Sequence, residues 1–403
     1  MKTAAIICEY NPFHSGHKHQ IDEIRRQFGE DTRIIAIMSG NYTQRASLAF
    51  APKHSRAAWA LECGVNLVLE LPFPYSMASA ELFALAGVRI AERLGVIDIL
   101  SFGSESGDID ALYNIARNMA NENYEAELSR LMNDDSLVSL GYPRLCEIAY
   151  ASLFGDNKTD ITAPNNILAI EYIKAIIRTQ SAIVPHTIAR VGAGYNDAMI
   201  DSAVHQSASA IRAAVFSGDE SAFSHLPECV ARDLREKIVS GLLPVDEEAL
   251  SPALISHFLL NNAPVHDIHD AQGGLYNRIA AKSREATSIS SLYELSQTKK
   301  YTTARIRRAI WFSFFGVTSS DVKDAPLFTR VLAADEIGRK ALKEIKKING
   351  ISVITKPSDD QGLSPKAKKI KLLSDRADLV FQLALPKKAP PADALRATPL
   401  VKK

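Results

Sequence analysis

The stretch Cys8-Glu-Tyr-Asn-Pro-Phe-His-Ser-Gly-His17 separates an apolar run, residues 3–8, from a segment with helical periodicity that reaches about Phe28. Pro12 disfavours helical backbone at the residue before it, so the chain must turn there. Gly16 lacks a side chain that would keep the phosphates of a ligand away from backbone amides. The helix that follows adds the positive end of its dipole. This order of strand, turn and helix predicts the entrance of a nucleotide pocket.

Two histidines in this turn are the candidate catalytic residues. His14 and His17 are three residues apart, so within a first helical turn they share a face and reach one phosphate group. Each can donate a hydrogen bond to an oxygen that gains negative charge. The alternative is a surface pair or a local helix cap. The position after the first strand of an α/β domain favours the site, because such domains bind ligands beyond the carboxyl ends of their strands.

The composition is that of a globular protein with a sizeable core. The chain has 403 residues, of which 46% are hydrophobic and 23% charged, which predicts two domains or one large and one small domain. The formal net charge of +1 shows no general excess for nucleic acid, so such a partner requires a local basic patch. The four cysteines form no CxxC pair, and the first apolar run ends at Glu9. We therefore expect reduced thiols, no metal site, no membrane span and a cytoplasmic location.

The first part of the chain alternates between strands and helices. Short apolar strands separated by helices predict right-handed crossovers and a Rossmann-like parallel sheet, whose strand ends gather on one edge. A fifth strand contains Pro185, which marks it as an edge strand. The expected strands are residues 3–8, 33–38, 66–71, 97–102 and 183–188, and the expected helices are residues 17–28, 52–63, 76–94 and 164–178.

The remaining segments divide the chain further. Residues 108–155 are helical and polar, which predicts an insertion or lid at the ligand edge of a first domain of residues 1–215. Residues 216–385 show no alternation of strands and helices, and we expect a mainly helical second domain there. The Pro/Ala/Lys-rich residues 386–403 predict a flexible tail.

The polar residues at the expected strand ends are mostly hydrogen-bond donors and cations. The sequence has no nucleophile elbow, no Walker lysine and no pair of metal-binding histidines on a helix. Such a set binds phosphates and stabilises charge, which fits nucleotidyl transfer. Its members are Asn11, His14, His17, Ser39, Gly40, Asn41, Gln44, Arg45, Gly103, Ser104, Glu105, Asn165, Arg190 and residues 207–212.

Several of these residues have a plainer interpretation. Residues 39–41 could form only a turn, and Asn165 or Asn166 could simply cap a helix. Lys53 and Arg56 are expected on a solvated helix face. Arg190 and Arg212 have a stronger case, because arginine binds phosphate with two donors or stacks on a base.

A basic and aromatic stretch lies in the second half of the chain. Residues 292–315 interleave Lys300, Arg305 and Arg308 with aromatic residues. Basic side chains beside aromatics suit RNA with exposed bases, so these three cations are the predicted RNA contacts. A helix with one cationic face and one aromatic core face would show the same pattern. Further basic clusters are residues 339–347 and 366–371.

Five motifs together resemble the tRNA(Met) cytidine acetate ligase family, within the wider HxGH nucleotidyltransferase superfamily. They are Glu9 to His17, Met38 to Arg45, Phe102 to Glu105, Pro164 to Leu168, and Arg190 to Tyr195. The similarity is close over the first ~215 residues and continues through residues 274–278 and 301–305.

The resemblance implies an ATP-dependent ligase. In such an enzyme acetate is activated as acetyl-adenylate with release of pyrophosphate, and the acetyl group passes to N4 of the wobble cytidine of elongator tRNA(Met). Mg²⁺ would share the charge of the phosphates. The resemblance places the following residues at ATP: Ile7, Cys8, Glu9, Tyr10, Asn11, Pro12, Phe13, His14, Ser15, Gly16, His17, Lys18, His19, Gln20, Gly103, Asn165 or its neighbour Asn166, Arg190, Ser209 and Arg212.

Two departures from the family pattern are visible. The last superfamily signature, a serine-threonine pair before xIR, reads Ser207-Ala-Ser-Ala-Ile-Arg212 and lacks the threonine. The segment Ala51-Pro52-Lys53 lacks an expected acidic residue. Two other functions remain open: a small-molecule adenylyl- or cytidylyltransferase, which leaves the second half unexplained, and a nucleotide-sensing RNA-binding protein without turnover.

Overall fold

The structure, a computed structural model, describes residues 1–155, 159–190, 207–261, 267–298 and 300–402. In these residues eight strands form one sheet in the order β5-β4-β1-β2-β3-β6-β7, and β8 pairs with β6. The strands are β1 (Thr3–Cys8), β2 (Arg33–Ser39), β3 (Leu67–Leu71), β4 (Ile99–Ser104), β5 (Val184–Ala189), β6 (Phe328–Ala334), β7 (Ser352–Ile354) and β8 (Leu400–Val401).

The first five strands are parallel, as the alternation of strands and helices predicts. Their residues are almost all buried in β1 to β4, because helices cover both faces of the sheet. β5 pairs only with β4 and forms the edge of the sheet, in agreement with its proline. The carboxyl ends of these strands therefore lie together at one edge.

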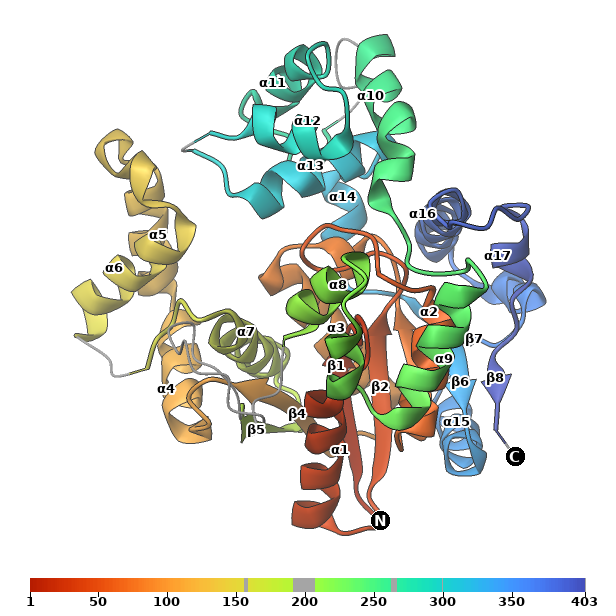
Figure 1. The fold of residues 1–403 in the computed structure, drawn as a ribbon. Coiled ribbons are helices and arrows are strands. Elements are labelled where there is room, and N and C mark those ends of the chain that lie inside the picture. The colour runs from red at the N-terminus through yellow and green to blue at the C-terminus, as the bar shows by residue number, and fades with distance from the viewer. Residues whose placement is uncertain (156–158, 191–206, 262–266, 299, 403) are drawn as a thin grey trace.

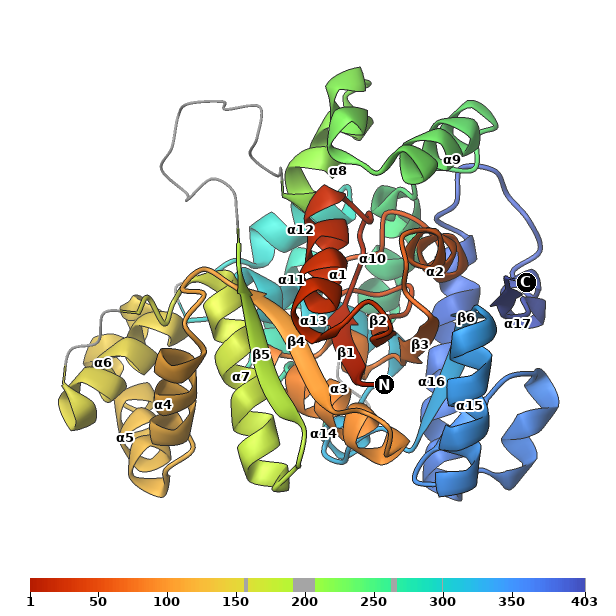
Figure 2. The same cartoon turned by 90° about the horizontal axis from the view of Figure 1, so that it is seen from below.

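Helices cover both faces of the parallel part of the sheet. Helices α1 (Ser15–Phe28) and α2 (Lys53–Glu62) lie on one face, and α3 (Ala80–Leu94) and α7 (Pro164–Thr179) on the other (Figure 2). The fit of α3 is close, because a Cβ at Gly87 would lie 2.6 Å from Cδ1 of Ile7 on β1. The packing of these helices against the sheet holds the carboxyl ends of the strands in place.

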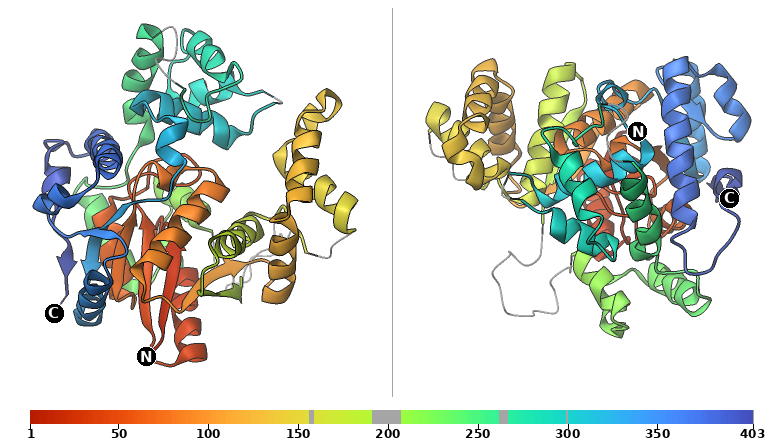
Figure 3. Two further views of the ribbon diagram at one scale, coloured as in Figure 1. Left: turned by 180° about the vertical axis from the view of Figure 1, so that it is seen from behind. Right: turned by 90° about the horizontal axis from the view of Figure 1, so that it is seen from above.

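The predicted insertion is present between β4 and α7. It consists of α4 (Ile109–Met119), α5 (Glu122–Met132), η2 (Asp135–Leu140) and α6 (Tyr142–Phe154). The views in Figures 1 and 3 show that it projects sideways from the β4–β5 side of the molecule and does not cover the sheet edge as a lid.

Two groups of helices lie beyond the first five strands. One contains α8 (Ala208–Phe216), η3 (Glu220–His225) and α9 (Glu228–Val239), which lie in front of the sheet (Figure 1). The other, here called the upper lobe, stands above the strand ends (Figures 1 and 3). It comprises η4 (Glu247–Leu250), α10 (Ser251–Leu260), α11 (Leu275–Lys282), α12 (Ile289–Ser296), α13 (Thr303–Phe315) and α14 (Ser319–Val322).

An aromatic seam joins the upper lobe to the sheet. Tyr42, which follows β2, lies 5.5 Å from Trp311 and 5.6 Å from Phe315 between ring centroids. Phe73, which follows β3, lies 5.0 Å from Phe315. The aromatic residues of α13 therefore pack into the core. This agrees with the alternative interpretation, in which the helix has one cationic face and one aromatic core face.

Residues 216–385 are mainly helical, but two strands that the sequence analysis does not foresee, β6 and β7, join the sheet near their end. β6 pairs antiparallel with β3, and α15 (Glu336–Ile348) then leads to β7, which is parallel to β6. The last helices are α16 (Pro365–Gln382) and the short α17 (Asp393–Arg396), with η5 (Pro357–Gly362) before them. The chain end is not wholly a loose tail either, because Leu400–Val401 pairs with β6. Among the described residues, no helix combines the length and apolar composition that a membrane span requires.

Candidate active site

His14 and His17 form the start of α1. His14 is the N-cap residue, with φ −132° and ψ 173°, and its Nδ1 accepts a hydrogen bond from the Gly16 amide at 3.1 Å. Nδ1 of His17 accepts from the His14 amide at 3.2 Å. The two rings are stacked with centroids 3.7 Å apart. Since Nδ1 is an acceptor in each neutral ring, the hydrogen lies on Nε2. The pair is thus a helix cap with a hydrogen on each Nε2, and of the two rings His14 lines the pocket described below whereas His17 lies outside its lining.

The electrostatics of the pair keep His17 neutral. Burial holds the pKa of His17 well below its usual range, and its electrostatic interactions with His14 and Arg190 act in the same direction. A neutral imidazole can donate to a phosphate oxygen and strengthen that bond as the oxygen gains charge.

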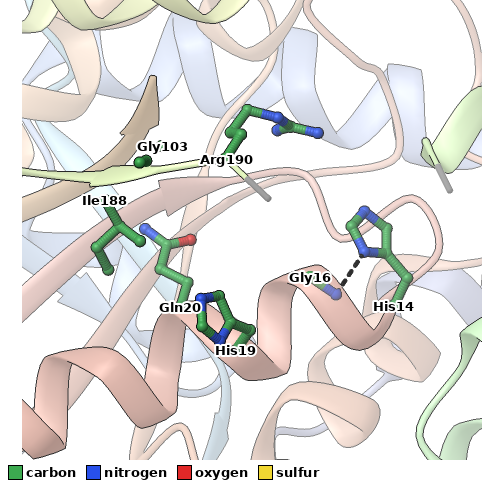
Figure 4. Close-up of a pocket in the computed structure, with 8 residues that line it drawn as sticks. His14, Gly16, His19, Gln20, Gly103, Ile188 and Arg190 are labelled. Carbon is green, nitrogen blue, oxygen red and sulfur yellow. Dashed lines mark hydrogen bonds between the residues drawn. The ribbon is translucent and has the colours of Figure 1, made fainter. Parts of the chain in front are cut away.

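A pocket opens beside this pair, between the first turns of α1 and the ends of β4 and β5. Figure 4 shows the His14 ring and the Arg190 guanidinium pointing into the same space above the start of α1. The lining residues are His14, Gly16, His19, Gln20, Gly103, Ile188, Ala189 and Arg190. Six of them are among the predicted ATP residues. Ile188 and Ala189 were not predicted, although parallel pairing places the end of β5 beside Gly103.

Arg190 reaches the pocket across Gly103. A Cβ at Gly103 would lie 3.4 Å from Cγ of Arg190, so the glycine lets the arginine stem pass close to β4. Nη1 of Arg190 donates to Oδ1 of Asn165 at 3.3 Å. The amide nitrogen of that side chain donates in turn to Oε1 of Glu105 at 2.6 Å. These contacts aim the guanidinium and leave it exposed.

The two neighbouring asparagines have different surroundings. Asn166 is 1% exposed, its Oδ1 accepts from the Glu105 amide at 3.0 Å, and its Nδ2 donates to the Asp160 carbonyl at 2.8 Å. Neither asparagine caps α7, because Ala163 is the N-cap residue. Glu105 does so instead, since its Oε2 accepts from the Asn166 amide at 2.7 Å. Asn165 therefore belongs to the pocket rim and Asn166 to its support.

Comparison with known proteins agrees with this geometry. The HIGH Nucleotidyl Transferase family model matches residues 1–393. The tRNA(Met) cytidine acetate ligase of Caldanaerobacter subterraneus subsp. tengcongensis is 34% identical over 360 residues, which are 88% of this chain and 89% of the relative. The protein of the same name from Acetivibrio thermocellus is 34% identical over 377 residues, or 89% of each chain. The chain belongs to the tRNA(Met) cytidine acetate ligase family.

Solved structures support this membership along the full length. The crystal structure of Thermotoga maritima TmcAL bound with alpha-thio ATP has a TM-score of 0.89 and 29% identity, covering 100% of both chains. The apo form has a TM-score of 0.90 and 30% identity, covering 100% of this chain and 99% of that chain. The predicted family and the predicted α/β nucleotidyltransferase fold are thereby confirmed, and the chain belongs to an enzyme family of the ligase class.

In this family member, two arginines fix the turn before the histidines. Arg212, from α8, donates from Nη1 to the Asn11 carbonyl at 2.7 Å. The side chain of Asn11 accepts from the Phe50 amide at 2.7 Å. Arg56 donates from Nη1 to the Glu9 carbonyl at 2.6 Å. The predicted residue Arg212 therefore binds the backbone of the turn, beside the pocket.

The expectation of a solvated face for Lys53 and Arg56 is wrong. Arg56 is 0% exposed, and besides Glu9 it donates to the carbonyls of Ser39, Gly40 and Ala51. Lys53 is 4% exposed and paired with two buried carboxylates, described below. Most partners of Lys53 and Arg56 come from distant segments. The residues next to them in the sequence therefore do not indicate that these two side chains are buried.

The other residues that the family pattern places at ATP do not line this pocket. Tyr10 and Phe13 are buried against each other with ring centroids 4.7 Å apart. Burial raises the pKa of the Cys8 thiol, which is thus no nucleophile at neutral pH. Ser15 donates to the His225 carbonyl at 2.8 Å, and Lys18 pairs with Asp22 on the exposed side of α1. Ile7, Pro12 and Ser209 also lie outside the lining.

The three predicted RNA contacts divide into two kinds. The side chain of Arg308 is 9% exposed, and its Nε lies 2.5 Å from Oδ2 of Asp270. This buried ion pair is the physical reason to remove Arg308 from the predicted RNA surface. Lys300 is exposed, and a third of the Arg305 side chain is exposed, with its guanidinium 4.7 Å from the Tyr301 ring centroid.

No metal cluster exists within the part of the chain that the structure describes: three His, Cys, Asp or Glu side chains are nowhere grouped to hold an ion. The four cysteines are free thiols, as expected. Of the five family motifs, residues 191–195 lie outside the described residues.

Proposed function

We propose that this chain activates acetate with ATP and transfers the acetyl group to N4 of the wobble cytidine of elongator tRNA(Met). The observation that carries the proposal is the convergence of the His14 ring and the Arg190 guanidinium on one space above the start of α1. Donors and a cation around a helix start suit the α-phosphate of a nucleotide under attack.

The chemistry requires activation before transfer. Acetate is a poor acyl donor and the cytosine amino group is a weak nucleophile, so a mixed anhydride with adenylate must form first. In that step acetate displaces pyrophosphate from the α-phosphorus of ATP. His14 and His17 donate to oxygens that gain charge as pyrophosphate leaves.

We assign the other residues in and beside the pocket to binding and alignment. Arg190 holds the nucleotide, with Asn165 orienting its guanidinium and Gly103 giving it room. Arg212 shapes the turn through the Asn11 carbonyl, and the serine hydroxyls at the start of α8 supply further donors toward the phosphates. Alignment of this kind accounts for much of the rate of phosphoryl-type transfers.

We propose that Mg²⁺ enters with the triphosphate. Magnesium is commonly bound by substrate phosphates together with one or two carboxylates. It would neutralise part of the charge on the phosphates. The predominance of donors and cations at the pocket fits a site where the nucleotide brings most of the oxygen ligands.

We assign tRNA binding to the upper lobe, which stands above the strand ends in Figure 1. Lys300 and Arg305 remain the predicted phosphate contacts there, and the reaction takes place in the cytoplasm, where charged nucleotides and tRNA are found together. The target base must leave its stack to reach the pocket.

The decisive experiment is ATP–pyrophosphate exchange with and without acetate, followed by mass analysis of nucleosides from tRNA(Met) incubated in the same mixture. We expect acetate-dependent exchange and a 4-acetylated cytidine. His14→Ala and His17→Ala should each lower exchange at least about 100-fold, while tRNA affinity stays near that of the wild type.

Other outcomes identify the competing functions. Exchange that ignores acetate would indicate a small-molecule adenylyltransferase. No exchange under any condition would indicate a nucleotide-sensing RNA-binding protein. Full activity of either histidine variant would remove that residue from the mechanism.

A further inference from the structure

Glu9 is a fixed carboxylate at the centre of the ligand edge. It follows β1 directly, and its Oε1 accepts a hydrogen bond from the Gln44 amide at 2.7 Å. Its own carbonyl accepts from Arg56 at 2.6 Å. Both the backbone and the side chain of Glu9 are therefore held, and the carboxylate is turned toward the loop after β2.

This carboxylate lies on the side of β1 that faces away from the nucleotide pocket. The pocket is lined from α1, β4 and β5, whereas the partners of Glu9 come from the loop after β2 and from α2. β1 lies between β4 and β2 in the sheet. A carboxylate also repels a triphosphate. Glu9 thus suits the second reactant, which must approach the activated acetate from outside the nucleotide pocket.

The second carboxylate oxygen is available for a ligand. Among the described residues, Oε2 of Glu9 has no hydrogen-bond partner, and the residue is partly exposed. Two guanidinium groups lie near this carboxylate: burial lowers the pKa of Arg56 to about 10 and also lowers that of Arg212, and the charge of Glu9 opposes both shifts. Oε2 of Glu9 can therefore accept a hydrogen bond from a ligand, at an edge of the sheet where most other polar groups are hydrogen-bond donors.

The chemistry of the acceptor matches this group. A glutamate carboxylate accepts hydrogen bonds from the exocyclic N4 amino group of cytosine, whereas uracil presents a carbonyl oxygen at the same position. On the basis of the proposed function, we propose that Glu9 binds the N4 amino group of the target cytidine and removes its proton during acetyl transfer.

The step balances as follows. The lone pair of N4 forms a bond to the carbonyl carbon of acetyl-adenylate. The bond from that carbon to the phosphate oxygen breaks, and AMP leaves with the electron pair. Oε2 of Glu9 takes one N4 proton, so that the product is a neutral amide, and later releases the proton to water.

The test separates the two half-reactions in Glu9→Gln. The glutamine Oε1 still accepts from the Gln44 amide, but an NH₂ group replaces Oε2 and cannot take a proton. We expect acetate-dependent ATP–pyrophosphate exchange within about threefold of the wild type. Single-turnover transfer from preformed acetyl-adenylate to tRNA should fall at least about 100-fold. Transfer at the wild-type rate would overturn the proposal, and so would an equal loss of exchange and transfer.

A matched control tests whether Glu9 acts only by holding the loop. Glu247 supports the same loop, with Oε2 accepting from the Leu48 amide at 2.8 Å and Oε1 accepting from the Tyr293 hydroxyl at 2.7 Å. An amide cannot accept at both positions, so Glu247→Gln loosens the loop. Transfer should stay within about threefold of the wild type in this variant. A loss as selective as that of Glu9→Gln would reduce Glu9 to a loop support. A wild-type enzyme without acetate-dependent exchange would instead refute the proposed function and, with it, this role.

Discussion

Lys53 on α2 and Asp378 on α16 form a buried ion pair, with Nζ 2.5 Å from Oδ2, across 325 positions of sequence. The same Nζ lies 2.7 Å from Oε1 of Glu70 on β3. Arg330 on β6 completes the cluster at 3.2 Å from Asp378. The cluster joins the carboxyl ends of the parallel strands to the last long helix.

Breaking this cluster should destabilise the whole chain. Lys53→Met leaves two carboxylates buried without their central cation, and we expect a loss of about 3 to 5 kcal/mol in the free energy of unfolding, measured by urea denaturation. The surface pair of Lys340 and Glu336 provides the control, because Lys340→Ala should cost less than about 1 kcal/mol. Equal small effects of the two variants would show that the cluster is not a structural link.

The two asparagines at the start of α7 should separate binding from stability. Asn166→Ala removes a buried amide with partners on Glu105 and Asp160, so we expect a loss of about 1 to 3 kcal/mol in stability. Asn165→Ala should leave the unfolding midpoint nearly unchanged and raise the KM for ATP in the exchange assay, because Arg190 loses its orienting partner. A stability loss in Asn165→Ala together with a raised KM in Asn166→Ala would show that Asn165 is the structural residue and Asn166 the one that acts on ATP binding.

The basic residues of the upper lobe should respond differently to neutralisation. Lys300→Ala and Arg305→Ala should each weaken tRNA binding and lower the slope of log affinity against log salt by about 1. Arg308→Ala should instead destabilise the protein by about 1 to 3 kcal/mol, since it leaves the half-buried Asp270 with only the longer contact to Arg305. Unchanged affinity and slope in the first two variants would return α13 to a purely structural role.

His54 should make stability depend on pH. Burial lowers its pKa to about 4, and the adjacent Lys53 acts in the same direction. Below about pH 6.5 His54 binds a proton in the unfolded chain but not in the folded chain. The free energy of unfolding therefore falls as the pH falls from about 6.5 to about 4.

His54→Gln removes this contribution. Between pH 7 and pH 5, the wild type should lose about 1 to 2 kcal/mol more than the variant in urea denaturation. Above pH 7 the two proteins should show the same pH dependence. Parallel curves over the whole range would contradict the burial of this imidazole.

The sequence was sufficient for the parallel part of the sheet and for the family. Short apolar strands, helical periodicity and the turn before His17 are local signals, and each of the first five strands lies where the pattern predicts it. The position of the pocket followed from the rule that parallel strands end at one edge. Its lining includes His14, Gly103 and Arg190, as predicted.

What could not be predicted depends on contacts between distant segments. The buried run of β6 cannot be told from a buried helix by its pattern, and its partner β3 lies some 260 positions earlier. Lys53 and Arg56 resemble solvated cations until α16 and the strand-end carbonyls are placed around them. Glu105 caps α7 from another segment, so no capping signal precedes that helix.

The pairing of β3 with β6 also determines when the chain can finish folding during synthesis. The edge of β3 stays open until residues 328–334 have left the ribosome, which at about 5 to 20 residues per second is a delay of roughly 13 to 50 seconds. During that time a row of unpaired amides and carbonyls is exposed to other nascent chains. A fragment that ends before β6 keeps this open edge, so we expect it to aggregate more readily than the whole chain unless another strand covers β3.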